Sequence, residues 1–171
     1  MPIANVTRSG ALSDPDALTN LRSNNNSSNV SASKEPGETV DKALNIRVFD
    51  DGKRTYTDEV GGSDDLDLYK FSTSRTNDFN FFLTDFGTDA DLDLRLLDGN
   101  GELLAVSNST GDAEILTGDL SAGTYFLGVV PYNRVDSNYE LSIYSGDNAL
   151  SSAEIMRLGF PSVLVTEFSE I

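Results

Sequence analysis

The sequence contains no cysteine, no histidine and no tryptophan among its 171 residues. Without cysteine, the chain has no disulfide framework, no thiol nucleophile and no cysteine-ligated metal. Without histidine, it lacks the usual general base near neutral pH and the commonest metal-binding imidazole. These absences exclude Ser-His-Asp hydrolysis, Cys-His proteolysis and histidine-ligated zinc chemistry. Carboxylates, hydroxyls, a few cationic side chains and hard cations remain, and we expect a protein that is not an enzyme.

Basic residues are also scarce, since 12 Lys and Arg are set against 28 Asp and Glu, for a net charge of −16. A surface this acidic repels phosphate backbones and anionic lipids, so we expect neither nucleic acid nor a membrane as a partner. No run approaches the ~18 apolar residues that a membrane-spanning helix needs. The N-terminus has neither the basic region nor the apolar region of a secretory signal. We therefore expect synthesis and retention in the cytosol, or export by a leaderless route.

The composition divides the chain into three zones. Residues 1–38 are polar and contain an Asn/Ser-rich tract that cannot bury enough apolar surface to fold alone, so they are expected to form an extended N-terminal arm. Residues 39–145 alternate short apolar–polar segments with turns and are predicted to form a β-domain. Residues 146–171 form a C-terminal arm, in which Ser151 and Glu154 have the spacing of a capping box before a short helix and one more strand follows.

The strand signals of the middle zone are strongest around residue 94. Leu92, Leu94 and Leu96 alternate with polar residues, which places the three leucines on one buried face. The turn residues at 98–101 then predict a tight hairpin, because Gly and Asn tolerate the positive φ that such turns require. Together with Phe81 and Tyr125, these leucines are expected to form one core. The spacing of the strands predicts an all-β fold, an antiparallel β-sandwich or jelly roll of about eight strands.

Five segments of the middle zone, in this order, resemble the bacterial pre-peptidase C-terminal domain, in a style similar to versions common in cyanobacteria: residues 39–46, 60–71, 89–98, 120–129 and 138–143. The resemblance implies a small, non-enzymatic β-sandwich of the kind usually appended to secreted proteases. In collagenase relatives it implies the ability to bind calcium and collagen. This chain departs from the family's context in its two arms, so its function must be argued from what is attached to the scaffold.

The resemblance also points to a calcium site. Asp64 and Asp67 occupy the loop and strand start where calcium-binding relatives place carboxylates, and Glu38 precedes the domain and supplies the other side, as Glu35 and Asp41 also could. Calcium takes six to eight oxygen ligands, so several acids from two segments are the right chemistry. The alternative is that these acids only solubilise the chain and shape turns. Calcium is thus a possible ligand, and no cofactor is required.

A second acidic segment has the spacing of an EF-hand, but the match fails. Asp89, Asp91 and Asp93 stand at the first alternate positions of such a loop, whereas Leu94 occupies the position that needs glycine. On a strand, the same spacing lines one solvated face.

The arms suggest a role in an assembly, because a compact sandwich offers no groove for their apolar residues. We expect these side chains to bind a partner, in part by adding a strand to its sheet edge: Leu18, Leu21, Val163, Leu164, Val165 and Phe168. On this hypothesis the chain is a structural cement or decoration protein of a phage with a cyanobacterial host. It would lie on the capsid surface of the virion after synthesis in the host cytoplasm, as a homo-oligomer such as a trimer bound to the major capsid protein. The alternative is a calcium-dependent adhesion or substrate-binding module that reaches the extracellular space by leaderless export.

Overall fold

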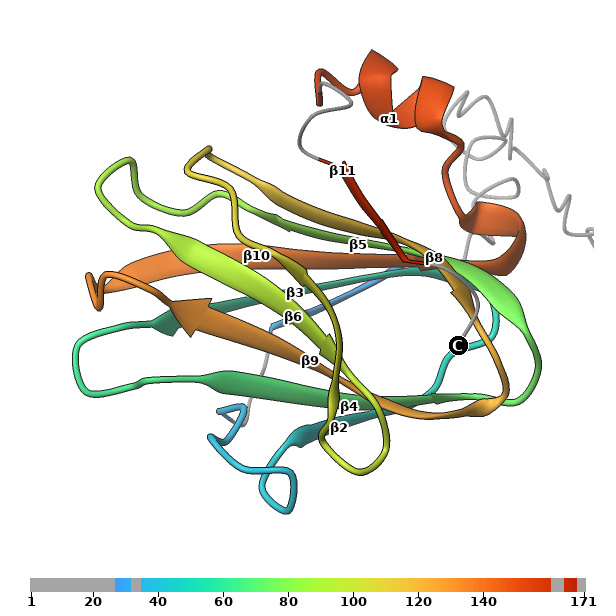
Figure 1. The fold of residues 1–171 in the computed structure, drawn as a ribbon, viewed down its shortest axis with the longest axis horizontal. Helices are drawn as coiled ribbons and strands as arrows, with labels where there is room; N and C mark the ends of the chain where they lie inside the picture. Colours follow the sequence, from blue (N-terminus) through green and yellow to red (C-terminus); the bar gives the residue numbers. More distant parts are fainter. Residues whose placement is uncertain (1–26, 32–34, 161–164, 169–171) are drawn as a thin grey trace, which may run out of the picture.

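Two β-sheets pack face to face in the computed structural model, which describes residues 27–31, 35–160 and 165–168 (Figure 1). The six-stranded sheet has the order β1 (Ser27–Ser31), β3 (Gly52–Val60), β10 (Ser137–Ser145), β5 (Asn77–Thr84), β8 (Glu114–Leu120) and β11 (Val165–Phe168). The five-stranded sheet has the order β2 (Leu44–Val48), β4 (Asp67–Thr73), β9 (Gly123–Pro131), β6 (Leu92–Leu97) and β7 (Leu103–Ser107). The predicted all-β sandwich is confirmed.

The number and direction of the strands differ from the prediction. The described residues form 11 strands rather than about eight, and three pairs run parallel: β1 with β3, β2 with β4, and β11 with β8. Each parallel pair adds a strand at a sheet edge, while the inner pairs are antiparallel. Both edges of the six-stranded sheet come from the predicted arms, so the sheet extends beyond residues 39–145. Alternation within one segment reveals a strand but not the direction of its neighbour, which explains the difference.

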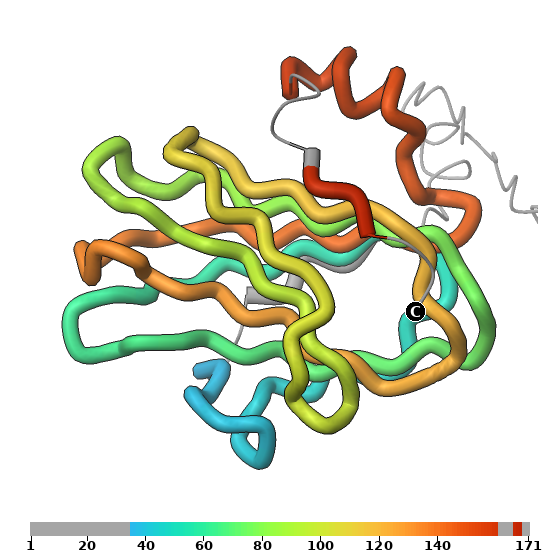
Figure 2. Tube along the Cα trace, viewed as in Figure 1, coloured from blue at the N-terminus to red at the C-terminus, as the bar shows by residue number. Residues whose placement is uncertain are grey.

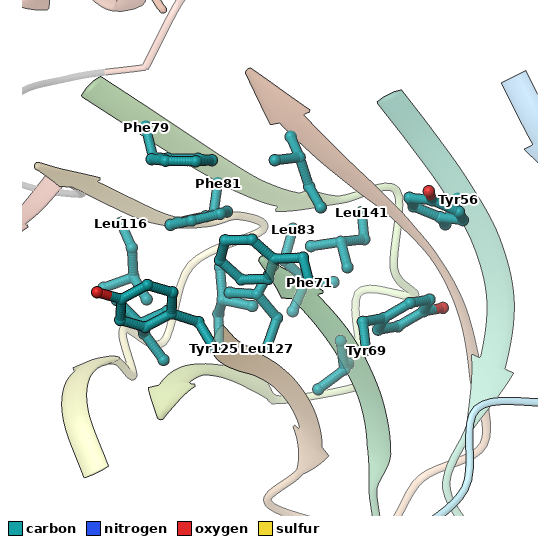
Figure 3. Packing of buried hydrophobic residues seen from close by; sticks show 14 of the residues in the cluster. Tyr56, Tyr69, Phe71, Phe79, Phe81, Leu83, Leu116, Tyr125, Leu127 and Leu141 are labelled. Atoms are coloured by element: carbon teal, nitrogen blue, oxygen red, sulfur yellow. The ribbon is translucent and has the colours of Figure 1, made fainter. Parts of the chain in front are cut away.

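The core lies between the two sheets and contains the residues expected there. Leu92, Leu94, Leu96, Phe81 and Tyr125 belong to one cluster of buried hydrophobic side chains. Figure 3 shows Phe79 and Phe81 of β5 facing Phe71 of β4 and Tyr125 of β9 across the sandwich. The ring centroid of Phe71 lies 5.5 Å from that of Phe79 and 5.7 Å from those of Phe81 and Tyr125, within the range of favourable aromatic pairs.

The predicted hairpin joins β6 to β7. The Asp98 carboxylate accepts hydrogen bonds from the backbone N–H groups of Asn100 and Glu102, both at 2.8 Å. Gly101 has φ of 85°, a left-handed conformation that glycine adopts without steric cost. These residues therefore form the tight turn that the sequence indicated.

The C-terminal segment packs on its own domain. Helix α1 (Ser152–Arg157) begins with the predicted capping box of Ser151 and Glu154. It lies on the outer side of the six-stranded sheet, where Ile155 packs against Phe82 and Ile115 in a second hydrophobic cluster (Figure 1). The expectation that apolar residues of 146–171 have no place within the chain is therefore wrong for Ile155.

The same correction applies to β11. Phe168 was expected to be buried against a neighbouring subunit, but it is 8% exposed and belongs to the main core cluster. Val165 was expected to bind a partner as well, and its backbone pairs with Ile115 of β8. The physical reason is Gly118, because a Cβ there would lie 2.2 Å from the carbonyl oxygen of Phe168. Because Gly118 has no side chain, β11 can pair with β8 and complete the edge of the six-stranded sheet.

Four further residues of the partner-binding prediction lie outside the described residues: Leu18, Leu21, Val163 and Leu164. Among the residues that the structure describes, no helix has the length and hydrophobicity needed to cross a membrane.

Candidate metal site

Three carboxylates from separate segments meet at one end of the sandwich. Glu35 precedes β2, Asp64 lies in the loop between β3 and β4, and Asp67 is the first residue of β4. One oxygen of each carboxylate lies within 4.8 Å of the others. Exposure falls along this series, because Glu35 is exposed, Asp64 is half-buried and Asp67 is fully buried. The cluster is therefore open on the side of Glu35 and closed on the side of the core.

A tight turn positions Asp64. The backbone of Gly61 and that of Asp64 exchange two hydrogen bonds, of 3.0 and 2.8 Å. The turn is braced by the β9–β10 loop, since the N–H of Gly62 donates to the carbonyl of Arg134 at 3.0 Å. A Cβ on Gly61 would lie 2.4 Å from the carbonyl oxygen of Val135, so only glycine permits this approach. Figure 2 shows the two loops side by side at the same end of the molecule.

The strand period positions Asp67 on the core face of β4, in line with Tyr69 and Phe71. The Tyr139 hydroxyl from β10 donates to Oδ2 of Asp67 at 2.5 Å, and the Tyr69 and Tyr139 hydroxyls are 2.7 Å apart. Oδ1 of Asp67 has no hydrogen-bond partner among the described residues. Buried polar atoms rarely lack a partner, so this oxygen is available to a ligand.

The cluster disfavours its own negative charge. The pKa of Asp67 is raised to about 8, chiefly by burial and further by the charges of Asp64, Asp58 and Glu35, while the hydrogen bond from Tyr139 opposes the shift. Burial also raises the pKa of Asp64, as do the charges of Glu35 and Glu38. Without a cation, Asp67 therefore holds a proton near neutral pH. A bound cation would remove this repulsion and favour the ionised form.

The ligand atoms select the kind of metal. The cluster offers only carboxylate oxygens, and the whole chain lacks cysteine and histidine. Hard cations prefer oxygen, and calcium tolerates irregular sets of six to eight ligands that include water and backbone carbonyls. Oδ2 of Asp64 has no hydrogen-bond partner in the described part of the chain, so it offers a second free ligand atom beside Oδ1 of Asp67. The arrangement fits calcium better than zinc or copper.

The structure brings together two of the three predicted ligands. Asp64 and Asp67 are adjacent, as the resemblance implied, but Glu38 is exposed and lies outside the group of three. Glu35 takes its place. Gly37 pairs with Leu68 of β4 in an isolated bridge, and the chain then turns away, with the N–H of Lys42 donating to the carbonyl of Thr39. Glu38 lies between this bridge and the turn and is exposed, whereas Glu35 comes before the bridge and belongs to the cluster.

Other acids of the acidic segments lie outside this cluster. Asp65 lies 3.3 Å from the guanidinium of Arg134 in an exposed ion pair, and Asp41 is exposed. Asp93 lies on β6 and contacts Arg95 at 3.5 Å, which agrees with a strand rather than an EF-hand loop. The expectation of a solvated face is wrong for Asp93, because it is buried.

Comparisons with known proteins identify structures with a similar fold at low sequence identity. No family model matches the sequence, and no curated protein matches it. Among solved structures, the pre-peptidase C-terminal domain of collagenase from Bacillus anthracis superimposes with a TM-score of 0.51 at 20% sequence identity. The match covers 64% of this chain and 98% of that domain. The chain has a β-sandwich fold like that of a pre-peptidase C-terminal domain. The Yersinia pseudotuberculosis-derived mitogen also matches, with a TM-score of 0.45 at 17% identity over 60% of this chain and 92% of that one.

Proposed function

We propose that the chain is a non-catalytic β-sandwich module that binds one calcium ion through Glu35, Asp64 and Asp67. The observation that carries the proposal is the unpartnered Oδ1 of Asp67, which is fully buried and belongs to a group of three converging carboxylates. A solubilising surface acid has no reason to be buried without a partner, because desolvating it is costly. Beside a cation, the same oxygen becomes a metal ligand, and the positive charge of the cation stabilises the ionised carboxylate.

The ion would also connect distant parts of the chain. Glu35 lies between β1 of the six-stranded sheet and β2 of the five-stranded sheet, whereas Asp67 is the first residue of β4 in the five-stranded sheet. Calcium bound between them would hold the segment before β2 against the β3–β4 loop. A few carboxylates supplemented by water suit the dissociation constants of about 10⁻⁴–10⁻³ M found in extracellular modules. The proposal therefore favours a calcium-dependent adhesion or substrate-binding module of an exported protein.

The capsid-cement hypothesis stays a prediction, and its main argument no longer supports it. That argument required the apolar residues of the C-terminal segment to lack a place on their own sandwich. Phe168 and Ile155 are instead buried within the chain. The major capsid protein and a homo-oligomeric lattice are thus not part of the function proposed here.

Thermal unfolding with and without calcium tests the proposal. At a calcium concentration of about 100 times the Kd, the stability gain is about 2.7 kcal/mol. For a chain of this size, such a gain raises the Tm by roughly 5–10 °C. Asp64→Asn should abolish the rise, and Glu35→Gln should weaken it. Glu38→Gln is the matched control, because Glu38 is a neighbouring exposed acid outside the cluster. It should keep much more of the rise than Glu35→Gln, since its charge acts on Asp64 without its being a ligand.

Two outcomes would contradict the proposal. One is an unchanged Tm of the unaltered chain at about 10 mM calcium, a concentration well above the expected Kd. The other is an equal loss of the calcium effect in Glu35→Gln and Glu38→Gln, which would indicate diffuse attraction to an acidic surface.

A further inference from the structure

The two edges of the five-stranded sheet are protected unequally. At one edge, β2 contains a register shift between Asn45 and Arg47, and Arg47 has φ of 68°. The guanidinium of Arg54, on β3 of the other sheet, donates to the carbonyl of Ile46 and, at 3.3 Å, to that of Val48. Bulges and side-chain caps of this kind prevent a sheet edge from pairing with other chains. The β2 edge is therefore closed by its own domain.

The opposite edge is β7, and it is open in the part of the chain that the structure describes. β7 pairs only with β6 there, and no side chain hydrogen-bonds the backbone of residues 103–106. A register shift near Leu104 leaves regular pairing over residues 105–107. The strand begins Leu-Leu-Ala-Val, and Leu103 is 57% exposed. An apolar edge without charge, proline or cap is a template for an added strand.

A groove of about 450 Å³ runs between this edge and β11 of the other sheet. Its walls are formed by residues 103–106 on one side and residues 166–168 on the other. Half-buried apolar side chains of β7 line it, and exposed Glu167 contributes the only charged side chain among its lining residues. Glu102, also exposed, stands immediately before β7. The groove thus has apolar side chains on its β7 side and a negative charge on its β11 side.

We propose that the β7 edge, together with the groove between β7 and β11, binds an extended segment of a partner protein that carries alternate apolar side chains and lysine or arginine. Backbone hydrogen bonds to β7 would give affinity, while alternate side chains would fill the groove. The basic residues are required by charge, since Glu167 and Glu102 border the site and the chain as a whole carries −16. This inference does not depend on the calcium site.

A second copy of the chain is the less favourable occupant. Two copies would each bring a net charge of −16, which opposes their association. A five-residue strand spans only about 17 Å, so pairing of two β7 edges would bury much less than the roughly 1,200 Å² of a stable interface. A short basic peptide avoids the charge repulsion, because its lysine or arginine side chains complement the acidic surface.

Fluorescence polarisation on the full chain tests the proposal with a labelled peptide of about seven residues in which lysine and valine alternate. The measurement is made at about 0.15 M salt, where distant charges are screened. A second peptide has the same sequence with alternate backbone amides methylated, which removes the strand hydrogen bonds and keeps the charge. We expect methylation to weaken binding by about tenfold or more, because several hydrogen bonds are lost.

Two variants and a matched control locate the site. Leu103→Lys places a charge on the open edge at an exposed position, and it should weaken binding of the lysine–valine peptide by about tenfold. Val48→Lys is the matched control, because Val48 is 55% exposed on the capped edge of the same sheet. It should leave binding unchanged. Glu167→Lys should weaken binding of the lysine–valine peptide and strengthen binding of a glutamate–valine peptide.

Several results would overturn the proposal. Equal binding of the methylated and unmethylated peptides would show attraction to the acidic surface alone. Equal effects of Leu103→Lys and Val48→Lys would place the binding elsewhere, and no binding of any peptide would remove the site. A dimer in sedimentation that Leu103→Lys dissociates would make a second copy the occupant. Tighter binding after removal of residues 1–26 would assign the edge to the chain's own N-terminal segment.

Discussion

Asp67→Asn should remove a pH dependence of stability that the unaltered chain shows in the absence of metal. The carboxylate is fully buried, and its pKa is raised to about 8 in the folded chain. In the unfolded chain, an aspartate has a pKa of about 3.9. Between these two values the folded state retains a proton that the unfolded state has lost. The stability that Asp67 contributes therefore falls as pH rises from about 4 to about 8, and is constant outside that window.

The size of the effect follows from the proton count. One proton difference changes the free energy of unfolding by about 1.4 kcal/mol per pH unit. Between pH 5 and pH 7, Asp67 should therefore cost the unaltered chain roughly 2–3 kcal/mol of stability. Asparagine resembles protonated aspartate in shape and still accepts the hydrogen bond from Tyr139, but it does not titrate. The stability of Asp67→Asn relative to the unaltered chain should thus increase by the same amount over this range.

Urea unfolding in the presence of a chelator, at pH 5, 6 and 7, measures this difference. Asp65→Asn is the control, because Asp65 lies in the same loop but is exposed and contacts Arg134. Its stability should run parallel to that of the unaltered chain. Parallel curves for the unaltered chain and Asp67→Asn would refute the reasoning, since they would mean that Asp67 is ionised or solvated in the folded state. Adding calcium at pH 7 should stabilise the unaltered chain and leave Asp67→Asn nearly unchanged.

Three further predictions concern the core, the C-terminal strand and the buried tyrosine. Leu94→Ala should destabilise the chain by about 2–5 kcal/mol in chemical denaturation, because Leu94 is fully buried between the sheets, and a change below ~0.5 kcal/mol would contradict that position. Gly118→Val should displace β11, since a Cβ there would lie 2.2 Å from the Phe168 carbonyl oxygen, and hydrogen exchange of residues 165–168 should rise while that of β9 does not; unchanged protection would contradict the packing. Tyr139→Phe removes the donor that lowers the pKa of Asp67, so apparent calcium affinity at pH 7 should fall and recover toward pH 9. A loss that is the same at both pH values would indicate a merely structural role.

Much of the fold could be predicted because local patterns agree with it. The alternation of Leu92, Leu94 and Leu96 identified a strand and its buried face, and the turn at residues 98–101 fixed the following hairpin. Ser151 and Glu154 identified the start of α1. In each case the determining interactions lie within a few residues of one another. A single sequence displays such interactions directly.

The two edge strands of the six-stranded sheet could not be placed in the same way. Ser27–Ser31 lies in an Asn/Ser-rich tract without alternation, and it joins the sheet by backbone pairing with β3. Val165–Phe168 has the composition of a strand, but its partner depends on Gly118, about 50 residues earlier in the chain. The fit between a missing side chain and a distant strand becomes visible only in three dimensions. This is why the C-terminal segment was expected to bind another molecule.

The metal site was predicted in part for a similar reason. Asp64 and Asp67 belong to one continuous segment, so the motif that contains them places them together. Glu35 and Glu38 are both glutamates, and they lie at similar distances along the chain from Asp64 and Asp67. The choice between them depends on the bridge of Gly37 with Leu68, which pairs residues about 30 positions apart. The burial of Oδ1 of Asp67 likewise follows from the packing of β4 against β10 and has no signal in the sequence.

The most direct test of the central claim is a crystal structure of the full chain grown with calcium at a concentration above about 1 mM, the upper end of the Kd range of extracellular modules. The account predicts one strong density peak about 2.3–2.6 Å from carboxylate oxygens of Glu35, Asp64 and Asp67, with Oδ1 of Asp67 among the ligands. A calcium ion bound elsewhere, or a water molecule at this position in place of the ion, would contradict it.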